Sequence, residues 1–322
     1  MLVGGHPMTT ELTGFGENIL EMLRKIETNK SNLYFGKSQG IHTDEYYFYC
    51  CELILQCLKE RKDSEAVNVI FGPQQINIEN NLRTVRLDIQ PEHTLVKKGG
   101  RSVTEKIEGN IPVTNRDEKY LVRICNFDYY KSLDGVIEYS IPNIINMQTC
   151  DSTKICEYAN KCKYIAPSLY NDNLENKNRK GTFTLFSLGA SPRRDEFLKT
   201  TGVENISGVF FAKDLINIYR SKAIMINIHQ TNHHHTFEEL RVLPALSQGV
   251  VVVAEDSPLK EHIPYSDSII WSSFKNVKDV VRDVENNYEK YRKKLFSTKF
   301  VDTLQQLRRD NVVNMKELIW QR

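Results

Sequence analysis

Hydrophobic and polar positions alternate regularly in the second half of the chain. Short apolar runs that predict buried strands are each followed by a segment with the spacing of an amphipathic helix. The expected strands are 182–188, 206–211, 223–228, 250–254 and 268–272, and the expected helices are 192–200, 214–220, 237–248, 276–295 and 298–320. This alternation predicts βαβ units and a parallel sheet. The run of four valines at 250–253 is apolar on both faces, as a central parallel strand requires.

The first half has a less regular pattern. Residues 44–59 carry apolar and aromatic side chains at helical spacing and predict a helix with one buried face. Further apolar runs predict strands at 66–72, 84–89, 120–125 and 135–139. The most polar stretch, 171–181, has no hydrophobic period and is typical of a linker.

Composition and charge narrow the class of protein. The 322 residues are 40% hydrophobic and 26% charged, which is enough to fill two ordinary cores and excludes a fibrous or wholly disordered chain. The formal net charge of +2 provides no strong field for holding a duplex, so a nucleic-acid partner is disfavoured. The longest aliphatic run, 250–254, is far shorter than the roughly 20 residues of a membrane span. With no signal-peptide pattern and seven cysteines interpreted as reduced thiols, a cytoplasmic protein is expected.

Polar segments follow three of the predicted strands in the second half, at 189–194, 229–236 and 255–257. The carboxyl ends of parallel strands meet at one edge of a sheet, and ligands of open α/β sheets bind there. We therefore expect these three segments to form one site.

The first of these segments predicts a phosphate site. Pro192 suits the first turn of a helix, and Arg193 and Arg194 follow it directly. Backbone N–H groups at a helix start and guanidinium groups together bind phosphate well. The alternative is that both arginines pair with Asp195 and Glu196 on a solvated face. Neither a P-loop nor a G-x-G-x-x-G motif is present.

The second segment contains four of the eight histidines, at 229–235. Imidazole is a common metal ligand, but three consecutive histidines cannot all face one ion in regular structure, and no H-E-x-x-H motif is present. We therefore expect no metal and no other cofactor. A polar loop that binds hydroxyl and phosphate groups is the favoured interpretation, with His229 among its ligands.

The residues after the histidines predict the start of a helix. Thr236 has the character of an N-cap, and Glu239 three residues later would complete a capping box. That arrangement leaves Glu238 and Arg241 as the free polar groups of the turn. In the third segment, Glu255 follows the valine strand, and either Glu255 or Glu261 is expected to bind a sugar hydroxyl.

The stretch from Thr182 to about Leu295 resembles the donor-binding half of GT-B-fold glycosyltransferases. The resemblance depends on Gly249, the valine strand and the acidic turn after it, together with the Ser-Pro-Arg-Arg loop at 191–194, where that fold holds its diphosphate. In many retaining members two glutamates precede the glycine at positions that Thr236 and Pro244 occupy here. Retention or inversion of the anomeric configuration therefore stays open.

The resemblance implies an α/β protein with two Rossmann-like domains and parallel sheets. We expect an acceptor domain at 1–150, a donor domain at 151–298, and a terminal helix at 299–322 that packs back on the first domain. The implied activity is metal-independent transfer of a sugar from a nucleotide-sugar to a glycan or another hydroxyl acceptor. Arg193, Arg194, His229, Thr236, Glu238, Glu239, Arg241 and Glu255 are the expected donor-binding residues.

An inverting transfer also needs a general base for the acceptor hydroxyl. His93 and Glu92 follow a predicted strand of the first half and are the candidates. Two rival functions are a metal-dependent hydrolase built on the histidines 229–235, and a nucleotide- or glycan-binding module without turnover.

Overall fold

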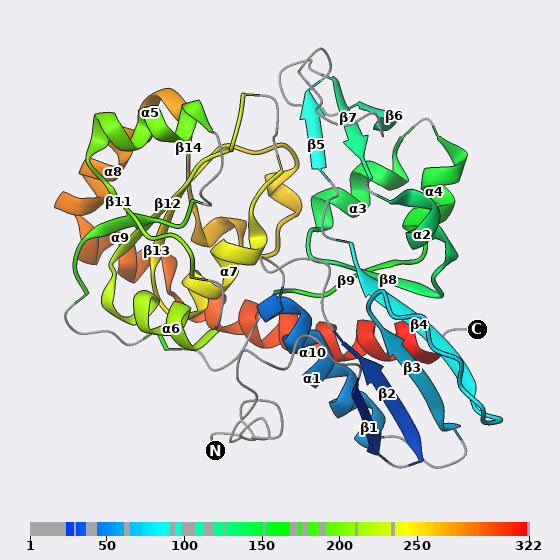
Figure 1. Cartoon of the computed structure of the whole chain (residues 1–322). Coiled ribbons are helices and arrows are strands. Elements are labelled where there is room, and N and C mark those ends of the chain that lie inside the picture. Colours follow the sequence, from blue (N-terminus) through cyan, green and yellow to red (C-terminus); the bar gives the residue numbers. More distant parts are fainter. Residues whose placement is uncertain are drawn as a thin grey trace.

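The two halves of the chain each form a mainly parallel β-sheet in the computed structural model (Figure 1). The structure describes residues 24–320 except for 29, 37–43, 61–64, 91–93, 98–106, 113–118, 125, 151, 168–172, 175–178, 187–190, 210–211 and 233–235. Among the described residues no helix is long and apolar enough to cross a bilayer.

The first sheet has six strands in the order β1-β2-β3-β4-β8-β9, and only the β1–β2 pair is antiparallel. Its strands are Arg24–Thr28 (β1), Ser31–Phe35 (β2), Val67–Phe71 (β3), Arg83–Ile89 (β4), Gly135–Glu138 (β8) and Cys162–Tyr164 (β9). The helices of this half are Asp44–Lys59 (α1), Phe127–Ser132 (α2), Ile141–Gln148 (α3) and Thr153–Ala159 (α4). A small antiparallel sheet adds Thr94–Lys97 (β5), Ile107–Pro112 (β6) and Lys119–Arg123 (β7).

The second sheet has five parallel strands in the order β11-β10-β12-β13-β14. They are Thr182–Thr184 (β10), Glu204–Asn205 (β11), Ile224–Asn227 (β12), Val251–Glu255 (β13) and Ile270–Ser272 (β14). The α-helices are Pro192–Thr201 (α5), Ala212–Ser221 (α6), Glu239–Ser247 (α7), Val277–Asn286 (α8) and Tyr288–Leu295 (α9). Three short 3₁₀ helices lie at Lys260–His262 (η4), Ser266–Ser268 (η5) and Phe274–Asn276 (η6).

The C-terminal helix α10 (Thr298–Trp320) returns to the first half, as the red helix in Figure 1 shows. It packs against α1, β8 and β9. Asn314 Nδ2 donates to the carbonyl of Tyr164 in β9 at 2.9 Å, and Lys316 pairs with Glu60 at 2.5 Å. Two mainly parallel sheets, with a terminal helix that packs back on the first, give the chain the two-part α/β architecture that its sequence predicts.

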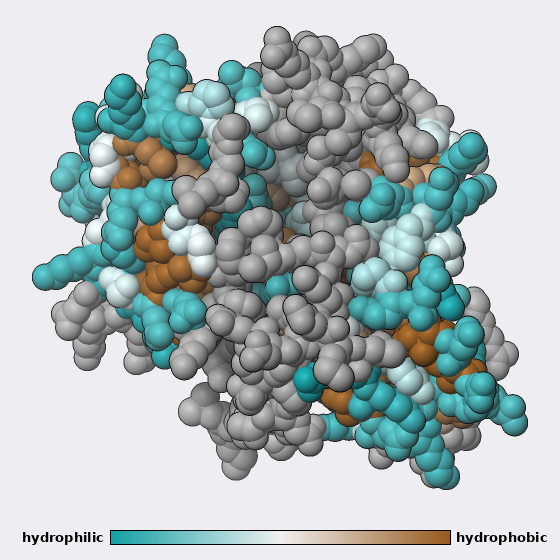
Figure 2. Space-filling view, viewed as in Figure 1, coloured by the Kyte–Doolittle hydropathy of each residue, from teal (hydrophilic) through white to brown (hydrophobic). Residues whose placement is uncertain are grey.

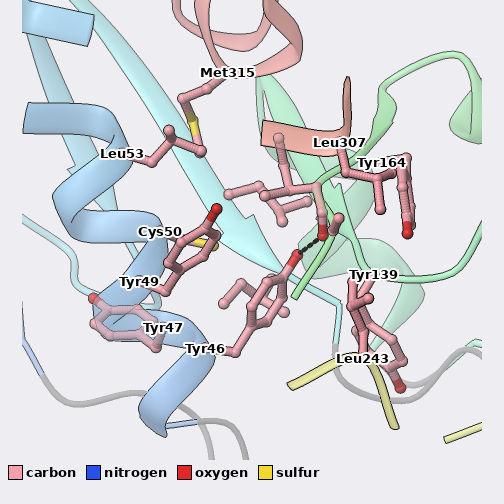
Figure 3. Close-up of a cluster of buried hydrophobic side chains, with 14 of the residues drawn as sticks. Tyr46, Tyr47, Tyr49, Cys50, Leu53, Tyr139, Tyr164, Leu243, Leu307 and Met315 are labelled. Carbon is pink, nitrogen blue, oxygen red and sulfur yellow. Dashed lines mark hydrogen bonds between the residues drawn. The ribbon is translucent and has the colours of Figure 1, made fainter. Parts of the chain in front are cut away.

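A single apolar cluster extends through both halves. It includes Ile54 of α1, Tyr164 of β9, Leu243 of α7 and Leu307 of α10. Figure 3 draws Leu243 of α7 together with Tyr139 and Tyr164 of the first half, which belong to this cluster. On the face shown in Figure 2, hydrophilic side chains cover much of the described surface. Because the apolar cluster contains residues of both halves, the two sheets share a continuous core.

Several predicted elements are confirmed and several are corrected. The predicted helices 44–59 and 298–320 match α1 and α10 at both ends. The predicted helix 276–295 is interrupted at Asn287, and the strand expected at 206–211 is replaced by the two-residue β11 at Glu204–Asn205. Strand β9 pairs with β8, so the first sheet extends beyond the domain boundary expected at residue 150.

The polar segment 171–181, expected to be a linker, contains a buried anchor. The side chain of Arg179 is 7% exposed and donates to the backbone carbonyls of Tyr219 and Gln248. These carbonyls belong to the ends of α6 and α7, where backbone acceptors lack helical partners. Arg179 therefore fixes the start of the second sheet to two helix ends.

Gly249, which closes α7, is expected to resist substitution. Its φ of 77° is in the left-handed region, and an added Cβ would lie 3.1 Å from the carbonyl oxygen of Asn173. We expect Gly249→Ala to lower the free energy of unfolding by about 2 kcal/mol, measured by urea denaturation. Gly208→Ala is the matched control, because Gly208 has a φ of 75° and open space around its Cα. If Gly249→Ala lowers the free energy of unfolding no more than Gly208→Ala does, the close approach to Asn173 adds nothing to the cost of the left-handed backbone.

Candidate functional site

The start of α5 lies beside the carboxyl end of β12. Ser191 is the N-cap of α5, and its Oγ accepts a hydrogen bond from Arg194 N at 3.3 Å. The same hydroxyl donates to the carbonyl of Gln230, just after β12, at 2.5 Å. Pro192 occupies the first helical turn, as predicted. The two loops are thus held together by one serine.

Arg193 and Glu255 form a two-pronged ion pair at this edge of the sheet. Nη1 and Nη2 of Arg193 donate to Oε2 and Oε1 of Glu255 at 2.7 and 2.5 Å. Nη1 also donates to the carbonyl of His229 at 3.0 Å, and the guanidinium lies 3.7 Å from the ring centroid of Phe274. The Arg193 side chain is 12% exposed, so it is held rigidly near the surface.

His229 completes this group with its backbone and its ring. Its N–H donates to Oε2 of Glu255 at 3.0 Å, and its Nε2 lies 3.0 Å from the carbonyl oxygen of Asp256. A carbonyl oxygen only accepts, so Nε2 carries the proton. Burial lowers the pKa of His229, and the imidazole is therefore neutral near pH 7.

Arg194 lies deeper, with only 3% of its side chain exposed. Its Nε and Nη2 donate to the carbonyl of Ile228 at 3.2 and 2.7 Å, and its Nη2 lies 3.5 Å from Oε1 of Glu238. Glu238 in turn lies 3.5 Å from Nη1 of Arg241. The guanidinium of Arg194 stacks 4.6 Å from the ring centroid of Phe186.

We define the donor network, named for the role that the sequence predicts for it, as Arg193, Arg194, His229, Glu238, Arg241 and Glu255. Burial by itself would raise the pKa of Glu238 and of Glu255, but the neighbouring arginines, and for Glu255 also the backbone N–H of His229, outweigh it and hold both below the usual value. Both carboxylates are therefore ionised near pH 7. With three guanidinium groups against two carboxylates and a neutral histidine, the network has an excess of one positive charge.

The structure brings most of the predicted donor-binding residues together, but several of them have partners other than those expected. Neither arginine pairs with Asp195 or Glu196 in the described residues; their partners are Glu255 and Glu238. Glu238 and Arg241, expected to be free, bind each other.

The predicted cap at the start of α7 is wrong. The helix begins at Glu239 with Glu238 as its N-cap, so the half-buried Thr236 lies two residues before the cap. Glu239 therefore cannot complete a capping box with Thr236, and its contacts are with tyrosines between the two halves. The buried hydrogen bonds of Glu239 to these tyrosines thus take the place of the cap that the local sequence predicts.

Two predictions lie outside the described residues. These are the base candidates Glu92 and His93, and the histidines 233–235 of the metal hypothesis. Among the residues that the structure describes, no group of three or more His, Cys, Asp or Glu side chains could hold a metal ion.

Sequence reasoning missed the two phenylalanines that support the arginines. Phe186 and Phe274 each offer a ring face to a guanidinium group, a contact that stabilises a desolvated cation. Phe274 is 81 residues away from Arg193 along the chain, so no local spacing could have indicated the pair.

Comparisons with known proteins give distant similarities. No protein-family model matches the chain. It is 27% identical over 170 residues to an uncharacterized protein, R358, of Acanthamoeba polyphaga mimivirus; these residues are 50% of this chain and 56% of that protein. The chain thus matches about half the length of this relative.

Two solved structures resemble the chain in overall arrangement. The crystal structure of TarM aligns with a TM-score of 0.46 and 10% identity, covering 84% of this chain and 58% of that one. An alpha-glucosyltransferase in complex with UDP-glucose and DNA containing an abasic site aligns with a TM-score of 0.31 and 10% identity, covering 85% of this chain and 80% of that one. Both likenesses are distant and concern the fold alone.

Proposed function

We propose that this chain is a glycosyltransferase that moves a sugar from a nucleotide-sugar to a hydroxyl acceptor, without a metal, in the cleft between its halves. The observation that carries this proposal is the donor network, which has excess positive charge and lies at the carboxyl edge of a parallel sheet beside the start of α5. Such an edge is where α/β folds bind nucleotides. A helix start with nearby guanidinium groups suits a diphosphate.

Arg193 is the residue that we expect to contact the leaving diphosphate. It is less buried than Arg194, and Glu255 and Phe274 fix its guanidinium in place. A cation that is already oriented stabilises the developing negative charge without reorganisation. Arg194 then holds the β12 loop through the carbonyl of Ile228, and serves the site by positioning it.

The polar groups around the arginines would position the rest of the donor. Thr236 and Glu238 precede α7, and Arg241 lies in its first turn. We expect these groups and the neutral His229 to orient the sugar and the ribose. For the acceptor, Glu92 or His93 stays the predicted base; loss of transfer in only one of Glu92→Gln and His93→Ala would identify it.

A thermal-shift screen tests the proposal. UDP, GDP, CMP and their common sugar conjugates are added at about millimolar concentration, with and without EDTA. Because a ligand that binds the native state raises the unfolding midpoint, we expect a shift with one nucleotide family that EDTA does not change. Absence of any nucleotide shift, with a midpoint that EDTA lowers, would favour the metal-dependent hydrolase.

A binding module without turnover is the second candidate. Thr236 and Pro244 favour it, because they occupy the positions at which many retaining transferases of the resembling fold have glutamates. The two candidates differ in product formation. A transferase releases a nucleoside diphosphate in the presence of an acceptor, whereas a binding module shows the thermal shift alone.

A further inference from the structure

Glu239 joins the two halves of the molecule through a fully buried carboxyl group. It is the first residue of α7, and its side chain is 0% exposed. Its Oε2 accepts hydrogen bonds from the hydroxyls of Tyr265 at 2.7 Å and Tyr164 at 3.3 Å. Tyr164 belongs to β9 of the first sheet and Tyr265 precedes η5 of the second half, so one oxygen ties α7 to both.

A second buried carboxyl group lies nearby. Glu138 ends β8, is 0% exposed, and accepts hydrogen bonds from Ser140 N at 3.0 Å and Asn143 Nδ2 at 3.2 Å. The groups that act on Glu239 are the hydroxyls of Tyr265, Ser140 and Tyr164 and the carboxyl of Glu138. None of these groups is a cation, so a negative charge on Glu239 would have hydroxyl donors but no counter-ion among them.

These surroundings favour the protonated form of Glu239. Burial raises its pKa to about 8, the hydroxyls of Tyr265, Ser140 and Tyr164 lower it, and Glu138 raises it further. The contacts also fit a neutral acid. Its Oε2 serves as the carbonyl oxygen that accepts both tyrosine protons, while Oε1, which is buried without a hydrogen-bond partner, carries the acid proton.

We propose that Glu239 is a positioning residue that holds the start of α7 as a neutral carboxylic acid and releases it when its proton is lost to solvent. Ionisation would place a charge beside buried Glu138 and leave Oε1 without a proton to donate. The adjacent Glu238 belongs to the donor network, so release would also move the partner of Arg194 and Arg241. Only this last consequence rests on the proposed function.

Glu239→Gln tests the proposal, because glutamine keeps an oxygen for the tyrosines and an N–H donor in place of the acid proton but cannot ionise. The native state holds this proton up to about pH 8, whereas the unfolded state loses it near 4.5, the ordinary pKa of a glutamate side chain. Unfolding therefore releases a proton between these values. We expect the wild type to lose stability relative to Glu239→Gln by about tenfold in the unfolding equilibrium constant per pH unit, and to level off above pH 8.

Two further measurements make the result specific. Infrared difference spectra should contain a protonated carboxylic acid band that disappears near pH 8 in the wild type and is absent from Glu239→Gln. Tyr265→Phe removes a hydrogen bond that favours the ionised form, so it should move this transition to higher pH. If Glu239→Gln does not fold, this shift of the transition in Tyr265→Phe tests the proposal by itself.

Glu52→Gln is the matched control. Burial and the nearby Glu45 raise the pKa of Glu52 to about 7, so it is another carboxyl group that titrates in this range. The transition near pH 8 should persist in Glu52→Gln. A carboxylic acid band with a transition near pH 8 that survives in Glu239→Gln, or that vanishes in Glu52→Gln, would overturn the proposal.

Nucleotide affinity separates this inference from the proposed function. UDP affinity measured by calorimetry should fall from about pH 7 to about pH 9 in the wild type and stay level in Glu239→Gln. If UDP, GDP and CMP bind at neither pH, the proposed function fails. The infrared and unfolding comparisons still decide the state of Glu239.

Discussion

Replacing Asn311 by leucine is expected to lower the free energy of unfolding by about 3 kcal/mol. Asn311 lies in α10 with 0% of its side chain exposed. Its Oδ1 accepts from Ala166 N at 2.7 Å, and its Nδ2 donates to Ala166 O and Tyr49 Oη, both at 2.9 Å. Leucine has a similar volume but makes none of these three hydrogen bonds. The N–H and carbonyl of Ala166 and the hydroxyl of Tyr49 therefore each lose a buried bond. Each buried group without a partner costs about 1–3 kcal/mol, and urea denaturation measures the sum.

Asn314→Leu is the matched control one turn away on the same helix. Asn314 is half-buried and donates to Tyr164 O at 2.9 Å, so water can replace much of what is lost. We expect a loss of about 1 kcal/mol or less. Equal losses at the two positions would mean that α10 frays from the first half before the core unfolds, and that Asn311 does not anchor it.

The second sheet could be predicted because its signals are local. The valine run of β13 is buried on both faces, and the helices that flank it repeat apolar residues at helical spacing. Where a residue's partner is distant, prediction failed. β9 has three residues and is defined by pairing with β8, and Arg179 is buried because two helix ends present carbonyls to it. Neither fact leaves a pattern in the local sequence.

The site shows the same division. Pro192 and Ser191 indicate a helix start by their own chemistry, and α5 begins there. The partners of Arg193 and Arg194 depend on how β12, β13 and α7 meet, so the local sequence could indicate neither Glu255 nor Glu238, and the alternative of pairing with their acidic neighbours in sequence is wrong. Glu239 satisfies a local capping rule, yet Tyr164 and Tyr265, far away in the chain, provide stronger bonds in a buried setting.

Arg193→Ala is expected to weaken nucleotide-sugar binding by about tenfold to a hundredfold, because a hydrogen bond to a charged group contributes about 1.5–3 kcal/mol. The same change leaves the carboxylate of Glu255, 11% exposed, without its ion-pair partner. The free energy of unfolding should therefore fall as well. Loss of binding in this variant alone would not separate a role in the site from a damaged fold.

The double variant Arg193→Ala/Glu255→Gln separates the two effects. The neutral amide needs no counter-ion, so the double variant should recover most of the stability that Arg193→Ala loses, since removing one member of a buried pair costs more than neutralising both. Its affinity for the nucleotide-sugar should stay low, because the cation that meets the diphosphate is still missing. Calorimetry and urea denaturation of the wild type and the two variants give both quantities. Wild-type affinity in the stable double variant would remove Arg193 from the phosphate site and leave its pair with Glu255 as a purely structural contact.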